Sequence, residues 1–207
     1  MGETTRVYLV RHGQTEWNKV ERYRGTIDVP LNDVGRGQAR ALARRLQAEK
    51  DVVAVYSSSR GRALDTARPI AEVLGLPVQA LAGIDDVSFG EWEGHTPAEV
   101  DELWPELHRR WQLAPHTVQF PGGDSLATVR ARAGAALAEA VARHAGQALV
   151  LVTHKVVCKV LLCATLGLDD AHYWQVEMDN ASFSLLEHVD GLYVLATMND
   201  TCHLRGE

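Results

Sequence analysis

The sequence predicts an α/β fold, a three-layer α/β/α sandwich around a mostly parallel central sheet with a smaller irregular helical cap region. Short runs of consecutive apolar residues at 7–10, 52–56 and 148–152 alternate with longer segments of helical spacing. Apolar residues at successive positions are typical of strands buried on both faces of a parallel sheet. Of the 207 residues, 46% are hydrophobic and 23% charged, so we expect a single globular domain over 1–207 with a cap-like insertion at about 85–124.

Local signals place the elements in order along the chain. Residues that can cap or stop a helix flank the helical segments, and Asp190-Gly191 is a hairpin turn signal. The expected elements are a strand at 7–10, a helix from Asn32 or Asp33 to about Glu49, a strand at 52–56, a helix from about Arg60 to Leu74, a short edge strand at 77–80, a helix at 97–112, a helix from Asp124 or Ser125 to about Ala145, a strand at 148–152, a buried helix at 156–166 and a hairpin of 182–188 with 192–197. The apolar edge strand at 77–80 could pair with that of a second copy, which would give a homodimer.

The charge balance and the cysteines argue against several classes of protein. A net charge of −6 disfavours binding to nucleic acid or to a membrane surface. No apolar run approaches the roughly 18 residues that cross a bilayer, and the short polar stretch before residue 7 does not resemble a secretory signal. Cys158, Cys163 and Cys202 are an odd number without disulfide-framework spacing, which indicates reduced thiols. A cytoplasmic location is therefore expected.

Two of the nine histidines follow predicted core strands. His12 comes after Arg11 and the strand at 7–10, and His154 comes after the strand at 148–152. Ligands of parallel sheets bind outside the carboxyl ends of the strands, so both imidazoles are expected at one crevice. Neither histidine has a partner at metal-ligand spacing, and no metal site is predicted.

Arginines near these histidines indicate an anionic ligand. Arg11 precedes His12, Arg62 stands at the opening of the helix after the second strand, and Arg24 lies in a loop. A guanidinium forks onto the oxygens of a phosphate, and the first amides of a helix also favour anions. Arg60 is the alternative to Arg62 as the arginine that binds the anion, although its side chain is expected to lie in solvent. Several arginines at one crevice of an acidic protein favour a small anion over a polyanion.

Several segments spread over the chain form a set in a fixed order. They are Leu9-Val10-Arg11-His12-Gly13-Gln14-Thr15-Glu16-Trp17-Asn18, Arg22-Tyr23-Arg24-Gly25, Val55-Tyr56-Ser57-Ser58 leading to Arg62-Ala63, Phe89-Gly90-Glu91-Trp92-Glu93-Gly94, Pro121-Gly122-Gly123-Asp124-Ser125 and Leu151-Val152-Thr153-His154. This set resembles the histidine phosphatase superfamily, in its phosphoglycerate-mutase-like branch of small bacterial phosphatases. The resemblance runs over nearly the whole chain.

The resemblance implies catalysis through a phosphohistidine. His12 would attack the phosphorus, and Arg11, Arg62 and His154 would surround the phosphoryl oxygens. His154 would act best as an imidazolium, and nearby carboxylates are expected to keep its proton near pH 7. Asn18 would donate to the transferring group. The arginines would supply the positive charge, so no metal ion or other cofactor is expected.

The chain departs from similar proteins at the residue expected to protonate the leaving alkoxide. Similar proteins often carry a glutamate at the position of Asp86, and an aspartate is intrinsically more acidic. Asp86 is predicted to be the general acid, kept protonated by burial or by the like charge of Asp85. The alternatives are that Asp85 and Asp86 only cap a turn, or that Glu91 or Glu93 donates the proton.

Two further departures concern substrate binding. Arg24 stands before Gly25, where relatives commonly carry glutamine, and Lys155 stands where many carry glycine. Asn18, Arg24, Gly25 and Lys155 are predicted to bind the substrate. The added positive charge would suit a substrate with a second anion, such as a carboxylate or another phosphate. The alternative is that the Arg24 or Lys155 side chain points into solvent.

Three functions are compatible with these residues. The favoured one is a metal-independent phosphomonoesterase that acts on a small phosphorylated metabolite. The alternatives are a phosphoglycerate mutase that uses the same histidine, and a phosphate-binding module without catalysis. The motifs do not choose among sugar phosphates, phosphoserine, phosphoglycerates and α-ribazole phosphate.

Overall fold

A six-stranded sheet in the order β3-β2-β4-β1-β5-β6 forms the centre of the molecule. In the computed structural model, which describes residues 2–49 and 51–205, the strands are β1 (Thr5–Arg11), β2 (Val52–Ser57), β3 (Val78–Ala80), β4 (Ala148–Thr153), β5 (Phe183–Val189) and β6 (Leu192–Asp200). β3, β2, β4 and β1 run parallel to one another, whereas β5 and β6 are antiparallel. The prediction of a mostly parallel sheet is thereby confirmed.

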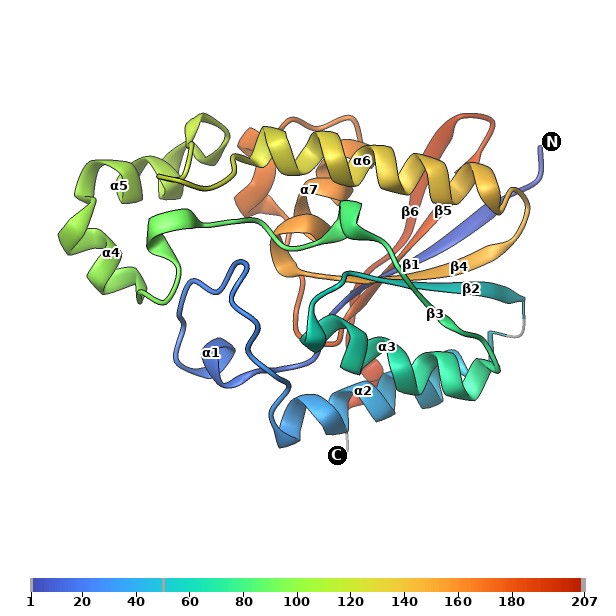
Figure 1. Ribbon diagram of the computed structural model, residues 1–207. Helices are drawn as coiled ribbons and strands as arrows, with labels where there is room; N and C mark the ends of the chain where they lie inside the picture. Colours follow the sequence, from blue (N-terminus) through green and yellow to red (C-terminus); the bar gives the residue numbers. More distant parts are fainter. Residues whose placement is uncertain (1, 50, 206–207) are drawn as a thin grey trace.

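Helices cover both faces of this sheet (Figure 1). α2 (Asp33–Leu46) and α3 (Gly61–Leu74) lie on one face, and α6 (Leu126–Arg143) and α7 (Lys155–Thr165) lie on the other. The three layers are those predicted from the alternation of apolar runs and helical segments, so the α/β/α sandwich is confirmed.

The strands in the middle of the sheet are buried on both sides. Along β1, Val7 and Leu9 pack in the core beneath α6 and α7, whereas Tyr8 and Val10 pack against α2 and α3. All four side chains are at most 2% exposed. Because successive side chains of a strand point to opposite faces, a strand covered on both faces needs apolar residues at every position.

The helix ends follow the capping signals in the sequence. The Asn32 side chain accepts the Gly35 amide at the start of α2, and the Ser125 side chain accepts the Thr128 amide at the start of α6. α3 ends at Gly75, which adopts a φ of 68°. Glycine is the residue that enters this left-handed region without a steric penalty, so the position stops the helix.

The single helix predicted at 97–112 is wrong, because the structure has two helices there. α4 (Pro97–Leu103) and α5 (Pro105–Leu113) are separated at Trp104, whose φ and ψ are −135° and 55°. Pro105 has no N–H to donate, and its ring forces the preceding residue out of the helical region. Also unpredicted are the short helix α1 (Glu16–Lys19) and the 3₁₀ turns at Ala82–Ile84, Gly90–Trp92, Pro115–Thr117, Asp170–Gln175 and Cys202–Leu204.

The irregular segment at 85–124 lies beyond the ends of β1 and β4, with α4 and α5 at its outer side (Figure 1). Aromatic side chains attach it to the core: the rings of Trp92, Trp111 and Phe89 all pack against Phe120, with centroids 4.8–5.1 Å apart. Edge-to-face packing of this kind stabilises large apolar clusters. Whether this segment acts as a cap stays a prediction.

Two other expectations concern surfaces. β3 is an edge strand, as predicted for 77–80, and its pairing in a homodimer stays a prediction. Among the helices formed by the described residues, none is both long and apolar enough to cross a membrane.

Candidate active site

His12 and His154 lie side by side at the carboxyl ends of β1 and β4. These strands are parallel neighbours, and Arg11 pairs with Thr153 at their last shared position. The His12 amide donates to the Thr153 carbonyl over 2.9 Å, and the two imidazole centroids are 5.2 Å apart. Both side chains are fully buried. The parallel register therefore places both histidines at one site.

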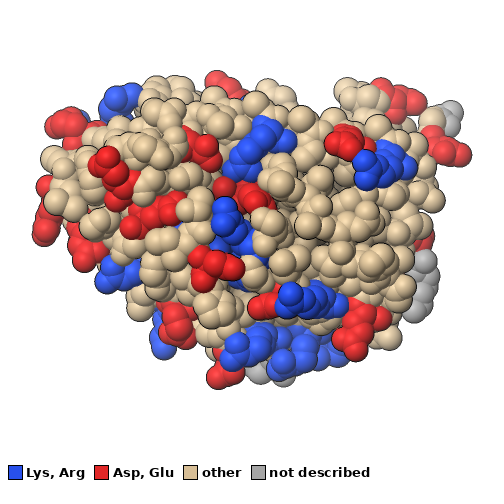
Figure 2. Space-filling view, viewed as in Figure 1, with Lys and Arg blue, Asp and Glu red and all other residues tan. Residues whose placement is uncertain are grey.

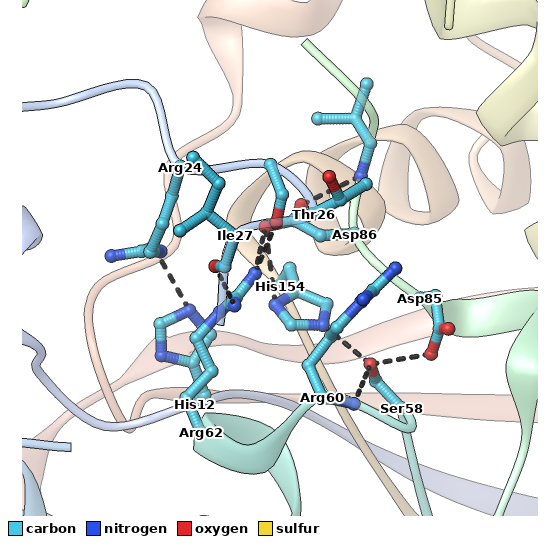
Figure 3. A network of polar contacts seen from close by, with 12 residues as sticks. His12, Arg24, Thr26, Ile27, Ser58, Arg60, Arg62, Asp85, Asp86 and His154 are labelled. Carbon is cyan, nitrogen blue, oxygen red and sulfur yellow. Dashed lines mark hydrogen bonds and ion pairs between the residues drawn. The ribbon is translucent and has the colours of Figure 1, made fainter. Parts of the chain in front are cut away.

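The tautomer of His12 follows from its hydrogen bonds. Its Nδ1 lies 2.7 Å from the Gly13 carbonyl oxygen, which can only accept, so Nδ1 carries the proton. The lone pair is then on Nε2, which lies 3.3 Å from the Arg24 guanidinium (Figure 3). Burial lowers the pKa of His12 well below 6.5, and the charge of Arg24 lowers it further. At neutral pH, His12 is a neutral imidazole whose unprotonated Nε2 accepts a hydrogen bond from Arg24. Once a phosphate draws this guanidinium to its own oxygens, the Nε2 lone pair can attack phosphorus.

Three buried arginines surround the two imidazoles. Arg11 donates to the Met178 carbonyl over 2.6 Å, and Arg24 donates to the Thr15 hydroxyl over 2.6 Å. Arg62 is 0% exposed and donates to the Gly25 carbonyl and to Asp86 over 2.8 and 2.9 Å. Arg60, the alternative to Arg62, is half-buried and makes none of these contacts.

The charge of this group suits an anionic ligand. Three guanidiniums face the buried carboxylate of Asp86 and the half-exposed carboxylate of Asp28, which lies 3.6 Å from Arg62, so positive charge remains in excess. A buried charge excess is costly unless a ligand neutralises it. A phosphomonoester carries the opposite charge and accepts several charge-assisted hydrogen bonds.

Gly25 positions the loop that receives Arg62. Its φ is 52°, and a Cβ at this position would lie 2.2 Å from Oε1 of Glu93 and 3.0 Å from the Val87 carbonyl oxygen. The residue therefore needs to be glycine, and its carbonyl accepts from Arg62. Gly25 therefore contacts Arg62 through its backbone carbonyl.

The expectation that Asp85 crowds Asp86 and keeps it protonated is wrong. The Asp85 carboxylate turns away and accepts hydrogen bonds from Ser58 and Ser59. Burial raises the pKa of Asp86, but His154, when protonated, and the permanent charges of Arg62 and Arg24 outweigh burial and leave this pKa below its ordinary value. Asp86 is therefore a carboxylate in the free protein, because its neighbours are cations rather than anions.

The expectation that His154 stays protonated near pH 7 is also wrong for the free protein. Burial lowers the pKa of His154 to about 3, against the raising effect of the Asp86 carboxylate. The nearby Arg62 and Arg24 charges lower it further. A fully buried imidazole beside guanidiniums stays neutral.

A cleft of about 390 Å³ is lined by Arg11, Arg24 and Asp86 of this group, whereas His12, His154 and Arg62 are not among its lining residues. Its lining includes Arg11, Asn18, Arg24, Asp86 and Lys155, together with Tyr23, Phe89, Trp111, Tyr173 and Trp174. The arginines and Asp86 form its polar end, and the aromatic rings form the wall beside them. A small phosphorylated molecule would therefore find anion-binding groups next to a largely apolar surface.

Asn18 and Lys155 belong to this cleft. The Asn18 amide oxygen accepts from the Thr15 amide over 3.0 Å and from Asn180 over 3.2 Å, so its amide nitrogen is the end that can donate to a ligand. Lys155 forms an ion pair with Glu177. The alternative that Arg24 points into solvent is wrong, whereas Lys155 is about one third exposed and part of its charge is balanced.

Comparison with known proteins agrees with this arrangement. The family model described as histidine phosphatase superfamily (branch 1) matches residues 7–201. This chain belongs to the histidine phosphatase superfamily. The predicted membership is thereby confirmed, and the protein is an enzyme of the phosphatase class.

Individual relatives of this superfamily match nearly the full chain. Phosphoserine phosphatase 1 of Hydrogenobacter thermophilus is 41% identical, over 96% of this chain and 94% of its own. The metal-independent phosphoserine phosphatase of Arabidopsis thaliana is 32% identical, over 98% of this chain and 84% of its own. The mycobacterial glucosyl-3-phosphoglycerate phosphatase, solved with VO₃, is 32% identical and superposes with a TM-score of 0.86 over 95% of this chain and 99% of its own.

Some residues of this histidine phosphatase site could not be identified from the sequence. The aromatic wall comes from three separate regions, and isolated tryptophans and tyrosines are far more often core residues. Ser58 contacts His154, and Asp85 contacts Ser58. In the sequence, Ser58 stood out only as part of the segment Val55-Tyr56-Ser57-Ser58, and Asp85 only as a crowding carboxylate or a turn cap. The only local signal was the position of Ser58 at the carboxyl end of β2, beside the crevice.

Proposed function

We propose that this protein hydrolyses small phosphorylated metabolites through a phosphohistidine formed on Nε2 of His12, without a metal ion. The observation that carries the proposal is the unprotonated Nε2 of a neutral, buried imidazole enclosed by guanidiniums, one of which donates to it. The names of the phosphoserine and glucosyl-3-phosphoglycerate phosphatases support a small phosphorylated substrate. The acidic chain and its free cysteines support a cytoplasmic location without nucleic-acid or membrane partners.

The first step forms the P–N bond. The Nε2 lone pair of His12 attacks phosphorus while the bond from phosphorus to the leaving oxygen breaks. Arg11, Arg24 and Arg62 stabilise the charge on the three equatorial oxygens, and Asn18 donates to one of them. Protonated Asp86 gives its proton to the leaving oxygen, so the products are an alcohol, the phosphohistidine and the Asp86 carboxylate.

The second step hydrolyses the phosphohistidine. The Asp86 carboxylate removes a proton from water, whose oxygen attacks phosphorus. The P–N bond breaks, and its electron pair returns to Nε2 of His12. Inorganic phosphate leaves, and both residues regain their starting states.

Binding of the substrate favours the protonated form of Asp86, which the free protein does not hold. Asp86 is a carboxylate in the free protein because the surrounding charges are positive. A bound phosphate dianion cancels these charges, which raises the proton affinity of Asp86 and of His154. We propose that Asp86 becomes the general acid in the complex, in preference to Glu93, whose carboxylate is engaged with the Thr26 amide and hydroxyl.

The arginines take the place that a metal ion has in other phosphatases. Arg11, Arg24 and Arg62 are held by backbone and side-chain acceptors before any ligand arrives. Preorganised positive charge of this kind stabilises a phosphoryl transition state without a Lewis acid. The name of the Arabidopsis relative, a metal-independent phosphoserine phosphatase, supports the same conclusion.

The substrate is proposed to carry a carboxylate in addition to its phosphate. Arg24 lies at His12 and so serves the phosphoryl group, while Lys155 and Glu177 form an ion pair at the cleft. Lys155 can receive a carboxylate of the leaving group. Phosphoserine is therefore the first metabolite to test, followed by phosphoglycerates.

The deciding experiment is hydrolysis of p-nitrophenyl phosphate in excess EDTA, from pH 5 to 8, with His12→Ala as the comparison. We expect turnover that survives chelation and is absent in His12→Ala. Loss of turnover in EDTA that added metal restores would contradict the metal-free mechanism. Absence of turnover at every pH, with interconversion of phosphoglycerates in the presence of bisphosphoglycerate, would instead identify the mutase alternative.

A further inference from the structure

Ser58 links the second histidine to a second carboxylate (Figure 3). Its Oγ lies 2.7 Å from Nε2 of His154 and 2.8 Å from Oδ1 of Asp85. Ser58 and His154 are both fully buried. Ser58 lies just after β2, His154 just after β4, and Asp85 in the loop after the turn Ala82–Ile84. The three side chains form a chain of hydrogen bonds that the reaction steps above do not use.

The hydrogen atoms in this series of hydrogen bonds can be assigned by counting the donors and acceptors of each side chain. An ionised carboxylate only accepts, so Ser58 donates its single hydroxyl proton to Asp85. Hydrogen bonds from Ser59 and Ser58 hold the pKa of Asp85 below its ordinary value against the raising effect of burial. Having no second proton, Ser58 accepts from His154. Nε2 of His154 therefore carries the proton.

This assignment leaves Nδ1 of His154 as the nitrogen that can take up a proton. Nδ1 faces Oδ2 of Asp86 at 3.4 Å, and it is buried without a hydrogen-bond partner among the described residues. A lone pair that faces a carboxylate oxygen is unfavourable unless a proton lies between the two. The geometry is thus prepared for one proton shared by Nδ1 and Oδ2.

We propose that Asp85, acting through Ser58, is a positioning residue that fixes the Nε2–H tautomer of His154 and keeps Nδ1 open for the proton shared with Asp86. The inference rests on the proposed function, because that proton is the one delivered to the leaving oxygen. Asp85 touches neither the substrate cleft nor the reacting atoms. Its role is to set which nitrogen of His154 is the acceptor.

The backbone around Asp85 is held firmly enough for this role. Arg132 donates to the carbonyls of Asp85 and Asp86 over 2.6 and 2.8 Å, and the Thr153 hydroxyl donates to the Ile84 carbonyl over 2.6 Å. The last bond ties this loop directly to the residue before His154. Asp85 and His154 therefore keep a fixed distance through Ser58.

Other charged groups near His154 do not set its tautomer. The groups that face it from the surrounding elements are His12 after β1, Arg24 in the loop after α1, Arg62 on α3, and Asp85 and Asp86 before the turn Gly90–Trp92. The guanidiniums only donate and so oppose a proton on either nitrogen. The Ser58 contact is the one that distinguishes Nε2 from Nδ1.

Removing the negative charge of Asp85 should allow the tautomer to reverse. In Asp85→Asn, the new amide can donate to Ser58, and Ser58 can then donate to Nε2. The proton of neutral His154 would move to Nδ1, where it donates to the Asp86 carboxylate and stabilises its ionised form. Asp86 would then take up the proton for the leaving oxygen less readily. Phosphoryl transfer would lose the assistance of a general acid, which is worth on the order of 10²–10⁴-fold.

The test compares leaving groups. Alkyl phosphates such as phosphoserine need a proton on the leaving oxygen, whereas p-nitrophenolate leaves without one. For Asp85→Asn and for Ser58→Ala, we expect kcat/KM to fall at least about tenfold with phosphoserine and less than about threefold with p-nitrophenyl phosphate. Ser59→Ala removes a different hydroxyl bonded to Asp85 and should change neither value by more than about twofold.

Two further measurements separate positioning from a merely structural effect. The ¹⁵N chemical shifts of His154 should show a protonated Nε2 in the wild type and a protonated Nδ1 in Asp85→Asn. Adding Asp85→Asn to Asp86→Asn should cause little further loss with phosphoserine, because both act on one proton. Equal losses with both leaving groups, or a wild-type Nδ1–H tautomer, would overturn the positioning role.

Failure of the proposed function would look different. If wild-type protein turned over neither substrate, or if His12→Ala were as active as wild type, the phosphohistidine mechanism would be wrong whatever Asp85 does. If wild type is active and dependent on His12 but Asp85→Asn shows no leaving-group preference, only the role of Asp85 is excluded.

Discussion

The chemistry of single residues here depends on burial next to fixed positive charge. His12 stays unprotonated at and below neutral pH because burial and Arg24 lower its pKa. Its Nδ1–H is committed to the Gly13 carbonyl, so the lone pair is always on Nε2. The same positive charge that keeps His12 neutral also binds the phosphate, so one set of arginines serves both tasks.

Replacing Arg24 by glutamine tests both tasks together. Arg24→Gln removes one charge from the phosphoryl site, and we expect the Ki of inorganic phosphate to rise about tenfold, as for loss of one charge-assisted hydrogen bond. Because the Arg24 charge lowers the pKa of His12, its removal raises that pKa. The acid limb of the pH profile of kcat/KM should therefore move to higher pH. Both proteins are measured with the same substrate, so that the ionisation of the substrate cancels in the comparison.

Arg22→Gln is the matched control for this prediction. Arg22 lies two residues away in the same loop and lines the same cleft, but its guanidinium binds Glu99 and the Gly94 carbonyl instead of His12. The control should leave the acid limb in place. An equal shift in both variants would mean that the loop as a whole, rather than the Arg24 charge, sets the protonation of His12.

At the scale of elements, the site is built from the ends of strands and the beginnings of helices. The end of β2 is followed by Ser58, and the first turn of α3 carries Arg62. The β4–α7 junction supplies His154 and Lys155. Each junction depends on where its helix begins and ends. The split between α4 and α5 at Pro105 likewise sets where Trp111 meets Phe120 and the cleft.

Two glycine substitutions test how helix ends are determined. Gly75→Ala should lower the free energy of unfolding by about 1 kcal/mol, because alanine resists the left-handed conformation that ends α3. Gly134→Ala, inside α6, should raise it by about 1 kcal/mol through helix propensity. Apart from the chain neighbours and, for Gly134, the backbone of its own helix, no described atom lies within 4 Å of a Cβ built at either position, so steric effects are matched.

Urea denaturation of the two variants and wild type measures both changes. Stabilisation by Gly75→Ala would contradict the role of this position as a left-handed helix stop. Activity should be unchanged in both variants, because neither glycine lines the cleft.

At the scale of the whole molecule, a protein of net charge −6 encloses a locally positive site. On the face shown in Figure 2, basic and acidic side chains are interspersed and form no continuous basic field. The positive charge that acts on the substrate is therefore buried at the strand ends rather than spread over this surface. This distribution suits a small anion.

The buried neutral histidines make the fold sensitive to acid. His12 and His154 have folded-state pKa values below 6.5, and that of His154 is about 3. Below pH 6.5, the unfolded chain binds a proton on each histidine that the folded protein does not bind. The free energy of unfolding should then fall by about 1 kcal/mol per pH unit for each histidine, in the window from 6.5 down to about 3 for His154.

Urea denaturation at pH 7.5, 6.0 and 5.0 checks this dependence. His154→Gln should show a shallower fall below pH 6.5, by about 1 kcal/mol per pH unit. His116→Gln, at an exposed position, is the control and should keep the wild-type slope. A fall of equal steepness in wild type and His154→Gln would exclude a neutral buried His154 as its cause.

The pattern of residues along the chain was sufficient to specify the sheet, the layers and the place of the main functional groups. Consecutive apolar residues in β1 and β4 specify strands buried on both faces, and the residues after such parallel strands lie at one edge of the sheet. His12 and His154 could be placed there for that reason, and Arg62 could be placed from its position at the start of a helix. Pro105 carried the signal that splits the helix predicted at 97–112, but the apolar spacing around it favoured a continuous helix.

Contacts in the folded chain were needed to establish which atoms of these residues are reactive. The tautomers of His12 and His154, the turn of Asp85 toward Ser58 and the aromatic wall of the cleft depend on contacts between distant parts of the chain. The charge states of His154 and Asp86 depend on burial and on neighbouring charges, which have no sequence signal. Periodicity and local motifs place a residue along an element, whereas hydrogen bonding and desolvation act through space.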